Sequence, residues 1–309
     1  MTVVGVDVGG TKTLIALVTA DGSILEFEEH PTKCDADDVE RVTVLTAHAL
    51  ERWRAHDIQA VAVGFPEYVS AGALSSREVL SWSRQPGELL REANERLGQP
   101  AMPVVIESDV RLGALGEARF GAGRGLASFV YLSLGTGLSS TLVIDGRCWA
   151  GERGEAIAIG EWNVVDRSIT GTLEAYASGS GIAARYLSQF AQPRSTKEIV
   201  ALARAGDASA EALLRSAGAE LGRACAAIVQ VVDPAALIIG GGLGTADSPV
   251  TDALRQQYER SLHRPSPPPI LIAELGPQAG VLGAAAAALA AAPAAAPVSA
   301  PARGQRHSD

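Results

Sequence analysis

The segment VGVDVGGTKT, residues 4–13, decides the interpretation of this amino-acid sequence, because it joins two apolar runs through a pair of glycines. The runs predict buried strands over residues 3–8 and 13–19, with Gly9-Gly10 as the turn between them. Asp21-Gly22 then predicts a hairpin turn into a third strand. The chain therefore opens with an antiparallel meander whose first turn is rich in glycine.

This first turn has the composition of a phosphate-binding loop. The backbone N–H groups of Gly9 and Gly10 can approach phosphate oxygens closely, and Thr11 adds a hydroxyl donor. Asp7, at the strand end, could hold Mg²⁺ through water, and Lys12 could offset phosphate charge. Neither the Walker A pattern nor GxGxxG occurs at this turn, so a plain hairpin with a surface lysine is the alternative.

The same order of signals returns in the second half of the chain. Strands are predicted over residues 129–134 and 139–145, with Gly135-Thr136-Gly137 between them and the turn Asp145-Gly146 after them. The sequence thus predicts a duplicated α/β architecture with a cleft between its halves. Hydrophobic spacing predicts further strands over residues 23–28, 60–64, 104–106, 236–239 and 270–273, and helices over residues 35–55, 87–97, 110–120, 172–189, 209–232 and 279–292.

Length and pattern divide the chain into two predicted domains. The first spans residues 1–112, with the helix around residues 279–292 packing back on it, and the second spans residues 113–278. Residues 293–309 are low in complexity and are predicted to form a disordered tail. The remainder has a globular composition, since 47% of all residues are hydrophobic and 20% are charged.

Charge and cysteine content narrow the classes of partner. With 26 Lys and Arg against 35 Asp and Glu, the net charge of −9 argues against nucleic acid. Cys34, Cys148 and Cys225 are too few and too widely spaced for a disulfide framework or a Cys/His zinc site. Neither a secretory signal nor a bilayer-spanning apolar stretch is evident, so a cytoplasmic protein without a membrane partner is expected.

Three further places could carry chemistry, each with a structural alternative. Asp109 in Glu107-Ser108-Asp109 could take a proton from a substrate hydroxyl, or it could be a helix N-cap. Gly240-Gly241-Gly242, after a buried strand, allows close approach of adenine or ribose, or forms a tight strand-to-helix turn. Glu161 and Glu174 could accept hydroxyl hydrogens from a polyol, or could be solvated surface residues.

Together these segments resemble the ROK family of sugar kinases and repressors, within the actin-like ATPase superfamily. The resemblance implies a two-domain, ribonuclease H-like fold, ATP and Mg²⁺ in the cleft, and phosphate transfer to a sugar-type hydroxyl. It rests on seven segments in the family's order: VGVDVGGTKT (4–13), VAVGFP (61–66), ESDVRLGALGEARFGAG (107–123), LSLGTG (132–137), TLEAYASGSGIA (172–183), VVDPAALIIGGGL (231–243) and LGPQAGVLGAA (275–285).

The resemblance also implies a role for each candidate residue. Asp109 matches the family's catalytic base, and a positioned carboxylate suits an alcohol acceptor, which must lose its proton. Asp7 would place Mg²⁺, and residues 9–12 and 135–137 would meet the phosphates, while residues 240–242 would border the adenosine. The implied acceptor residues are Gly64, Pro66, Ser108, Asp109, Glu161 and Glu174.

The sequence departs from the family pattern around the acceptor. Where the family has Glu-Asn-Asp, this chain has Ser108 in place of the asparagine. The family's Gly-Glu-Ile-Gly-His appears as IAIGE over residues 157–161, where Ala158 replaces the glutamate and Glu161 the histidine. If the alignment contains a short deletion, Glu161 instead corresponds to the family's glutamate. Both alignments stay open. Residues 165–171 replace the family's cysteine-rich zinc loop, so no zinc is expected.

These features predict an ATP-dependent kinase for the 6-hydroxyl of a hexose or an aminohexose. The phosphate turns match the family pattern and the acceptor segments do not, which favours an acceptor sugar that differs from glucose. A carboxylate can pair with an ammonium group, and kanosamine, an aminohexose of antibiotic pathways, carries one. Plain glucose is the simpler acceptor. The alternatives are a cyclitol kinase, a catalytically inactive sugar or nucleotide sensor, and an ATPase that acts on a protein partner. The family resemblance also suggests a homodimer.

Overall fold

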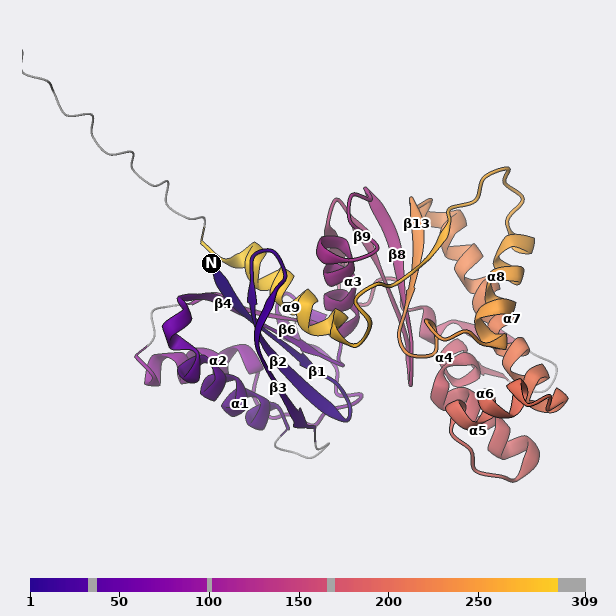
Figure 1. Ribbon diagram of the computed structural model, residues 1–309, viewed down its shortest axis with the longest axis horizontal. Helices are drawn as coiled ribbons and strands as arrows, with labels where there is room; N and C mark the ends of the chain where they lie inside the picture. Colours follow the sequence, from indigo (N-terminus) through magenta and orange to yellow (C-terminus); the bar gives the residue numbers. More distant parts are fainter. Residues whose placement is uncertain (33–37, 99–101, 166–169, 294–309) are drawn as a thin grey trace, which may run out of the picture.

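The computed structural model describes residues 1–32, 38–98, 102–165 and 170–293, which contain two five-stranded sheets (Figure 1). The first has the order β3-β2-β1-β4-β7, with β1 at Thr2–Val8, β2 at Lys12–Thr19, β3 at Ile24–Pro31, β4 at Ile58–Phe65 and β7 at Val104–Ser108. The second has the order β10-β9-β8-β13-β14, with β8 at Ser128–Leu134, β9 at Leu138–Ile144, β10 at Arg147–Trp149, β13 at Ala236–Gly240 and β14 at Ile270–Ile272. Each sheet joins a three-stranded antiparallel meander to two parallel strands, which confirms the predicted duplication.

The parallel strands of the first sheet end together at one edge. Asp7 of β1 lies opposite Gly64 of β4, and Gly64 lies opposite Glu107 of β7. These strands are built from valine and alanine, and Val63 is fully buried, as expected for strands covered on both faces. Because parallel strands present their carboxyl ends at the same edge, the residues that follow them, including Asp109, meet there.

The second sheet brings two predicted glycine segments together in the same way. Gly240 at the end of β13 lies opposite Ser133 near the end of β8. The carbonyl oxygen of Leu134 then accepts hydrogen bonds from the N–H groups of Leu243 and Gly244, at 3.0 and 2.9 Å. The loops that follow β8 and β13 are therefore neighbours.

Helices cover both faces of each sheet. α1 and α2 pack on one face of the first sheet, and α9 packs on the opposite face (Figure 1). α3 lies between α9 and the second sheet, while α4, α7 and α8 cover the other face of that sheet. The helices are α1 Asp38–Arg52, α2 Pro86–Arg96, α3 Asp109–Phe120, α4 Leu173–Ala177, α5 Gly179–Phe190, α6 Thr196–Arg204, α7 Ala208–Val232, α8 Pro249–Ser261 and α9 Ala279–Ala291.

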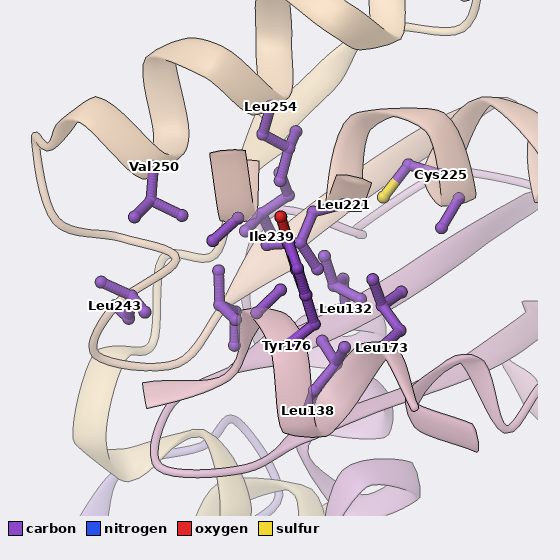
Figure 2. Close-up of a cluster of buried hydrophobic side chains, with 14 of the residues drawn as sticks. Leu132, Leu138, Leu173, Tyr176, Leu221, Cys225, Ile239, Leu243, Val250 and Leu254 are labelled. Carbon is purple, nitrogen blue, oxygen red and sulfur yellow. The ribbon is translucent and has the colours of Figure 1, made fainter. Parts of the chain in front are cut away.

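A buried apolar cluster fixes the helices of the second half on their sheet. Its side chains come from the strands on one side and from the five helices α4 to α8 on the other, so that each helix is held by removal of apolar surface from water. Figure 2 shows Leu132 of β8 and Ile239 of β13 packed with Leu173, Tyr176, Leu221 and Leu254 of the covering helices. Within the described residues, no helix is both long enough and apolar enough to cross a membrane.

Several predicted elements need correction. The single helix predicted over residues 172–189 is two helices, because Ser178 is extended and its hydroxyl accepts a hydrogen bond from the N–H of Gly181. α6 and α8 are additional helices that begin at the capping boxes of Ser195 and Ser248, a local signal that would have located them. The predictions for Cys34, for most of the replaced zinc loop and for residues 294–309 lie outside the described residues.

The contact between α3 and α9 requires glycine. A Cβ atom on Gly283 would lie 1.7 Å from the carbonyl oxygen of Leu112, and one on Gly116 would lie 2.6 Å from that of Ala279. On the far side of α3, Ala114 packs against Phe129 of the second sheet. This close helix crossing therefore connects the first sheet to the second.

Replacing Gly283 by alanine is expected to destabilise the protein by about 1–3 kcal/mol, because the added methyl group forces the two helices apart. Thermal unfolding followed by circular dichroism measures the change. Gly87→Ala is the matched control, because Gly87 lies in α2 and its Cβ would meet no atom closer than 3.6 Å. Alanine is the better helix former, so the control should match or exceed the wild-type Tm, and an unchanged Gly283→Ala protein would contradict the close crossing.

Candidate active site

One cavity collects residues from the ends of both sheets. It has a volume of about 470 Å³ and is lined by segments that follow β1, β4, β7 and β8, together with parts of residues 154–180. Of the residues predicted from sequence, the lining includes Gly10, Pro66, Ser108, Asp109, Thr136, Gly137, Glu161 and Glu174. The first glycine turn and the second therefore face the same space as the candidate base.

Asp109 is the first residue of α3, directly after β7. Its carboxylate accepts a hydrogen bond from the N–H of Val110, at 2.6 Å. Ser108 occupies the N-cap position, and its hydroxyl makes no capping hydrogen bond. Burial, together with the nearby negative charge of Asp7, raises the pKa of Asp109 to about 7. The carboxyl group can therefore hold or release a proton near neutral pH.

Asp7 lies near the end of β1, against the first turn of α9. A Cβ on Gly280 would lie 2.3 Å from the Asp7 Oδ2 atom, so glycine is required for this approach. Burial raises the pKa of Asp7 to about 6, and the positive charge of Lys12 opposes part of that rise. Carboxylate oxygen is the donor that Mg²⁺ prefers, and a cation beside Asp7 would relieve the cost of ionising it. The residues at this position fit a magnesium-bound nucleotide.

The glycine turns leave space for a ligand. A Cβ on Gly10, Gly135 or Gly242 would meet no atom within 4 Å, so the backbone is open on that side. In contrast, a Cβ on Gly240 would lie 2.3 Å from the Tyr131 hydroxyl, and one on Gly241 would lie 2.4 Å from the Leu134 carbonyl oxygen. Glycine at 240 and 241 therefore allows the neighbouring segments to pack closely. The open backbone at Gly10, Gly135 and Gly242 is suited to phosphate and nucleoside groups.

Other predicted residues lie beside the cavity and not in its lining. Lys12 pairs with Glu29 on the exposed surface, with 3.1 Å between Nζ and Oε2. Gly9 donates its N–H to the Lys12 carbonyl oxygen at 2.9 Å, and the Thr11 carbonyl oxygen accepts from Thr32. Gly64 packs behind the candidate base, since its Cβ would lie 3.7 Å from the Asp109 Cα atom.

The structure also shows lining residues that the sequence analysis missed, namely Glu67, Tyr68, Glu78 and Arg111. The Tyr68 hydroxyl donates a hydrogen bond to Glu161 across the cavity, which links the two halves. Arg111 is buried, and its Nε and Nη2 atoms contact the Glu107 Oε1 atom at 2.6 and 2.5 Å. The position of Glu67-Tyr68 directly after VAVGFP is the signal that could have identified this pair.

Glu161 and Ala158 both line the cavity, so each position considered in the two alignments of residues 157–161 faces the candidate acceptor space. Glu161 ends a short 3₁₀ turn at Ile159–Glu161. Glu174 lies near both glycine segments, because a Cβ on Gly160 would be 3.1 Å from its Oε2 atom and one on Gly137 would be 3.6 Å from its Oε1 atom.

The duplicated α/β fold is that of the actin-like ATPases. Its open glycine turns and a carboxyl group of raised pKa meet at one cavity, which is the arrangement of a phosphotransferase. The chain belongs to the ROK family, whose sequence profile matches residues 3–291. It is 31% identical over 312 residues to a protein named glucokinase from Streptomyces coelicolor, which covers 91% of this chain and 96% of that protein.

Solved structures extend the comparison. The ROK hexokinase from Thermus thermophilus superposes with a TM-score of 0.80 at 31% identity, covering 94% of this chain and 98% of that one. The ROK glucokinase from Streptomyces griseus, in complex with glucose and AMPPNP, gives a TM-score of 0.76 at 30% identity, covering 94% of this chain and 100% of that one. These similarities confirm the predicted fold and the predicted class of enzyme, an ATP-dependent sugar kinase.

Asp109→Asn is expected to stabilise the unliganded protein increasingly as the pH rises from about 4 to about 7, and by a constant amount above that. In the unfolded chain this carboxyl group ionises near 3.8, whereas in the folded protein it keeps its proton until about pH 7. Its contribution to stability is therefore complete below about pH 4 and is lost progressively as the pH rises to the folded pKa of about 7. Asparagine has no proton to lose.

The measurement is the Tm difference between Asp109→Asn and wild type at intervals from about pH 4 to about pH 8. Asp252→Asn, at an exposed position of α8, is the matched control. A difference for Asp109→Asn that stays constant across this range would contradict the raised pKa.

Proposed function

We propose that the protein transfers the γ-phosphoryl group of ATP to the 6-hydroxyl of a hexose or an aminohexose, with Asp109 as the general base. The observation that supports this most is that the Asp109 side chain and the glycine turns at Gly10 and Thr136-Gly137 line one cavity. A phosphate chain on the turns and a sugar beside Asp109 would then meet within a single space.

The chemistry asked of Asp109 is removal of one proton. A hydroxyl group is a weak nucleophile, and a carboxylate within hydrogen-bond distance accepts its proton as the new P–O bond forms. A base is most effective when its pKa lies near the working pH, and burial brings the pKa of Asp109 to about 7. The remaining work is alignment of the two reactants and exclusion of water.

Charge and orientation would come from the neighbouring groups. Asp7 is the residue that would hold Mg²⁺, and the metal, when bound, neutralises charge on the phosphates. Glu161 and Glu174 can accept hydroxyl hydrogens of the sugar, and the Ser108 hydroxyl can donate or accept. Pro66 forms part of the wall beside them. These contacts would fix which hydroxyl faces Asp109.

The acceptor is proposed to be an aminohexose of the kanosamine type or glucose. The relatives named glucokinase support a hexose. Ser108 in place of the family's acceptor amide supports a hexose with a changed substituent. A cyclitol with the same hydroxyl geometry is a further acceptor for the same base.

Asp109→Asn is expected to lower kcat by roughly 10²–10⁴-fold, because an amide cannot take the acceptor proton. ADP release in a coupled assay over glucose, aminohexoses and cyclitols measures the loss. Asp252→Asn, on the exposed surface of α8, is the control and should retain wild-type turnover. Turnover by Asp109→Asn equal to that of wild type on the preferred sugar would remove Asp109 from this role.

A further inference from the structure

The lining of the cavity carries an excess of negative charge. Among the described residues, Arg111 is the only lysine or arginine in the lining, and it is already engaged by Glu107. The remaining Arg111 N–H groups donate to the carbonyl oxygens of Gly154, at 3.0 Å, and Val69, at 2.5 Å. Five carboxyl groups of the lining form no ion pair with any described residue, namely Glu67, Glu78, Asp109, Glu161 and Glu174.

Glu67 holds the segment that carries Glu78. The Glu67 side chain is 5% exposed, and its carboxylate accepts hydrogen bonds from the N–H groups of Glu78 and Val79 at 2.8 Å and of Leu80 at 2.7 Å. The Ser76 hydroxyl donates to the same carboxylate. These bonds use the acceptor capacity of Glu67 and fix the backbone at Glu78.

Glu78 is left as a carboxylate that faces the cavity. Its side chain is exposed and has no hydrogen-bond partner among the described residues. Partial burial and the negative charges of Glu67, Glu161 and Glu174 raise the pKa of Glu78. Like charges held this close favour the binding of a positive group that reduces their repulsion.

A second, independent feature points to a polar ligand in the same space. The Ser108 Oγ atom is buried without a hydrogen-bond partner, and the residue is 5% exposed and lines the cavity. A buried hydroxyl without a partner is costly, so a ligand group that bonds to it recovers that cost. The site is therefore built for a molecule with hydroxyl or amino groups, and not for an apolar one.

An organic cation fits these carboxyl groups better than a metal ion does. Among the described residues, no three Asp, Glu, His or Cys side chains are arranged to hold a metal. The carboxyl groups instead lie on separate segments around a cavity of about 470 Å³. An ammonium donates three hydrogen bonds and carries its charge at one point of the ligand.

We infer that the acceptor is a hexose with a protonated amino group, and that Glu78 accepts hydrogen bonds from that ammonium. This inference rests on the proposed function, because it concerns the acceptor side of the same cavity. Glu78 would determine specificity, and Glu67 would position it. A neutral hexose would leave the charge of Glu78 uncompensated, and an N-acetylated sugar has no ammonium to offer.

Binding measured without turnover tests the inference. Calorimetric titrations use the whole chain with a non-hydrolysable ATP analogue and Mg²⁺, at neutral pH, with four sugars: 3-amino-3-deoxyglucose, glucosamine, glucose and N-acetylglucosamine. We expect one of the two ammonium sugars to bind about 10- to 100-fold more tightly than the neutral sugars, the range of one charge-assisted hydrogen bond. Glu78→Gln should remove most of this preference.

Two controls separate a specific contact from a general effect of charge. Glu152→Gln removes the same charge from an exposed residue outside the cavity lining and should keep the preference. Thermal unfolding of both variants establishes that they are folded. Equal affinity of wild type for glucose and both ammonium sugars would overturn the inference, and so would a Glu78→Gln protein that keeps the full preference.

Phosphoryl transfer measured in parallel separates this inference from the proposed function. An ammonium sugar that binds through Glu78 without being phosphorylated would support the inference and contradict the proposed kinase activity. Glucose that is bound and phosphorylated best, with no dependence of the sugar preference on Glu78, would support the kinase and overturn the inference. Phosphorylation of an ammonium sugar with a preference that Glu78→Gln abolishes would support both.

Discussion

The parallel register of β1, β4 and β7 is the constraint on which the site depends. It places Asp7, Gly64 and Glu107 in one row, so that the chain leaving β7 brings Asp109 to the same edge. A slip of one residue in any of these strands would turn its side chains to the opposite face. Gly64 adds a steric condition, because a Cβ there would lie 2.6 Å from a methyl group of Leu112 in α3. The start of α3 can therefore sit directly against the sheet edge.

The relation between the two sheets depends on a second set of contacts around α3. Glu117 is fully buried, and its carboxylate accepts hydrogen bonds from Ala122 at 2.8 Å, Glu274 at 3.1 Å and Leu275 at 3.0 Å. These N–H groups belong to the two connections between the halves, one after α3 and one before α9. The Glu117 carboxylate thus binds the backbone of both connections, next to the contact between α3 and α9. Because that crossing lies between the sheets, it determines how the glycine turns of the two halves face each other.

Local signals in the sequence were sufficient for most of the fold. Strand–glycine–strand patterns and Asp-Gly turns are short-range features, and Asp145 and Gly146 indeed have positive φ values of 48° and 71°, as a two-residue hairpin requires. Contacts between distant residues were not accessible in this way. Pairing of Lys12 with Glu29 depends on the register of β2 and β3, and the hydrogen bonds of Glu67 reach a segment 9 to 13 residues further along. Neither the ion pair nor the Glu67 hydrogen bonds leave a recognisable pattern in the sequence, because each depends on the path of the backbone in the folded protein.

The distribution of partners among the acidic residues explains why so much negative charge can coexist in one cavity. Carboxylates with a structural task are satisfied by the protein itself: Glu67 by backbone N–H groups and Glu107 by Arg111. Asp109 forms no ion pair with any described residue; it accepts a hydrogen bond from the N–H of Val110, and its pKa is raised by burial. A fold optimised for stability alone would pair or remove such a group, since desolvated charge without a partner costs free energy. The partly satisfied carboxyl groups are therefore where a substrate, and not the protein, completes the hydrogen bonding.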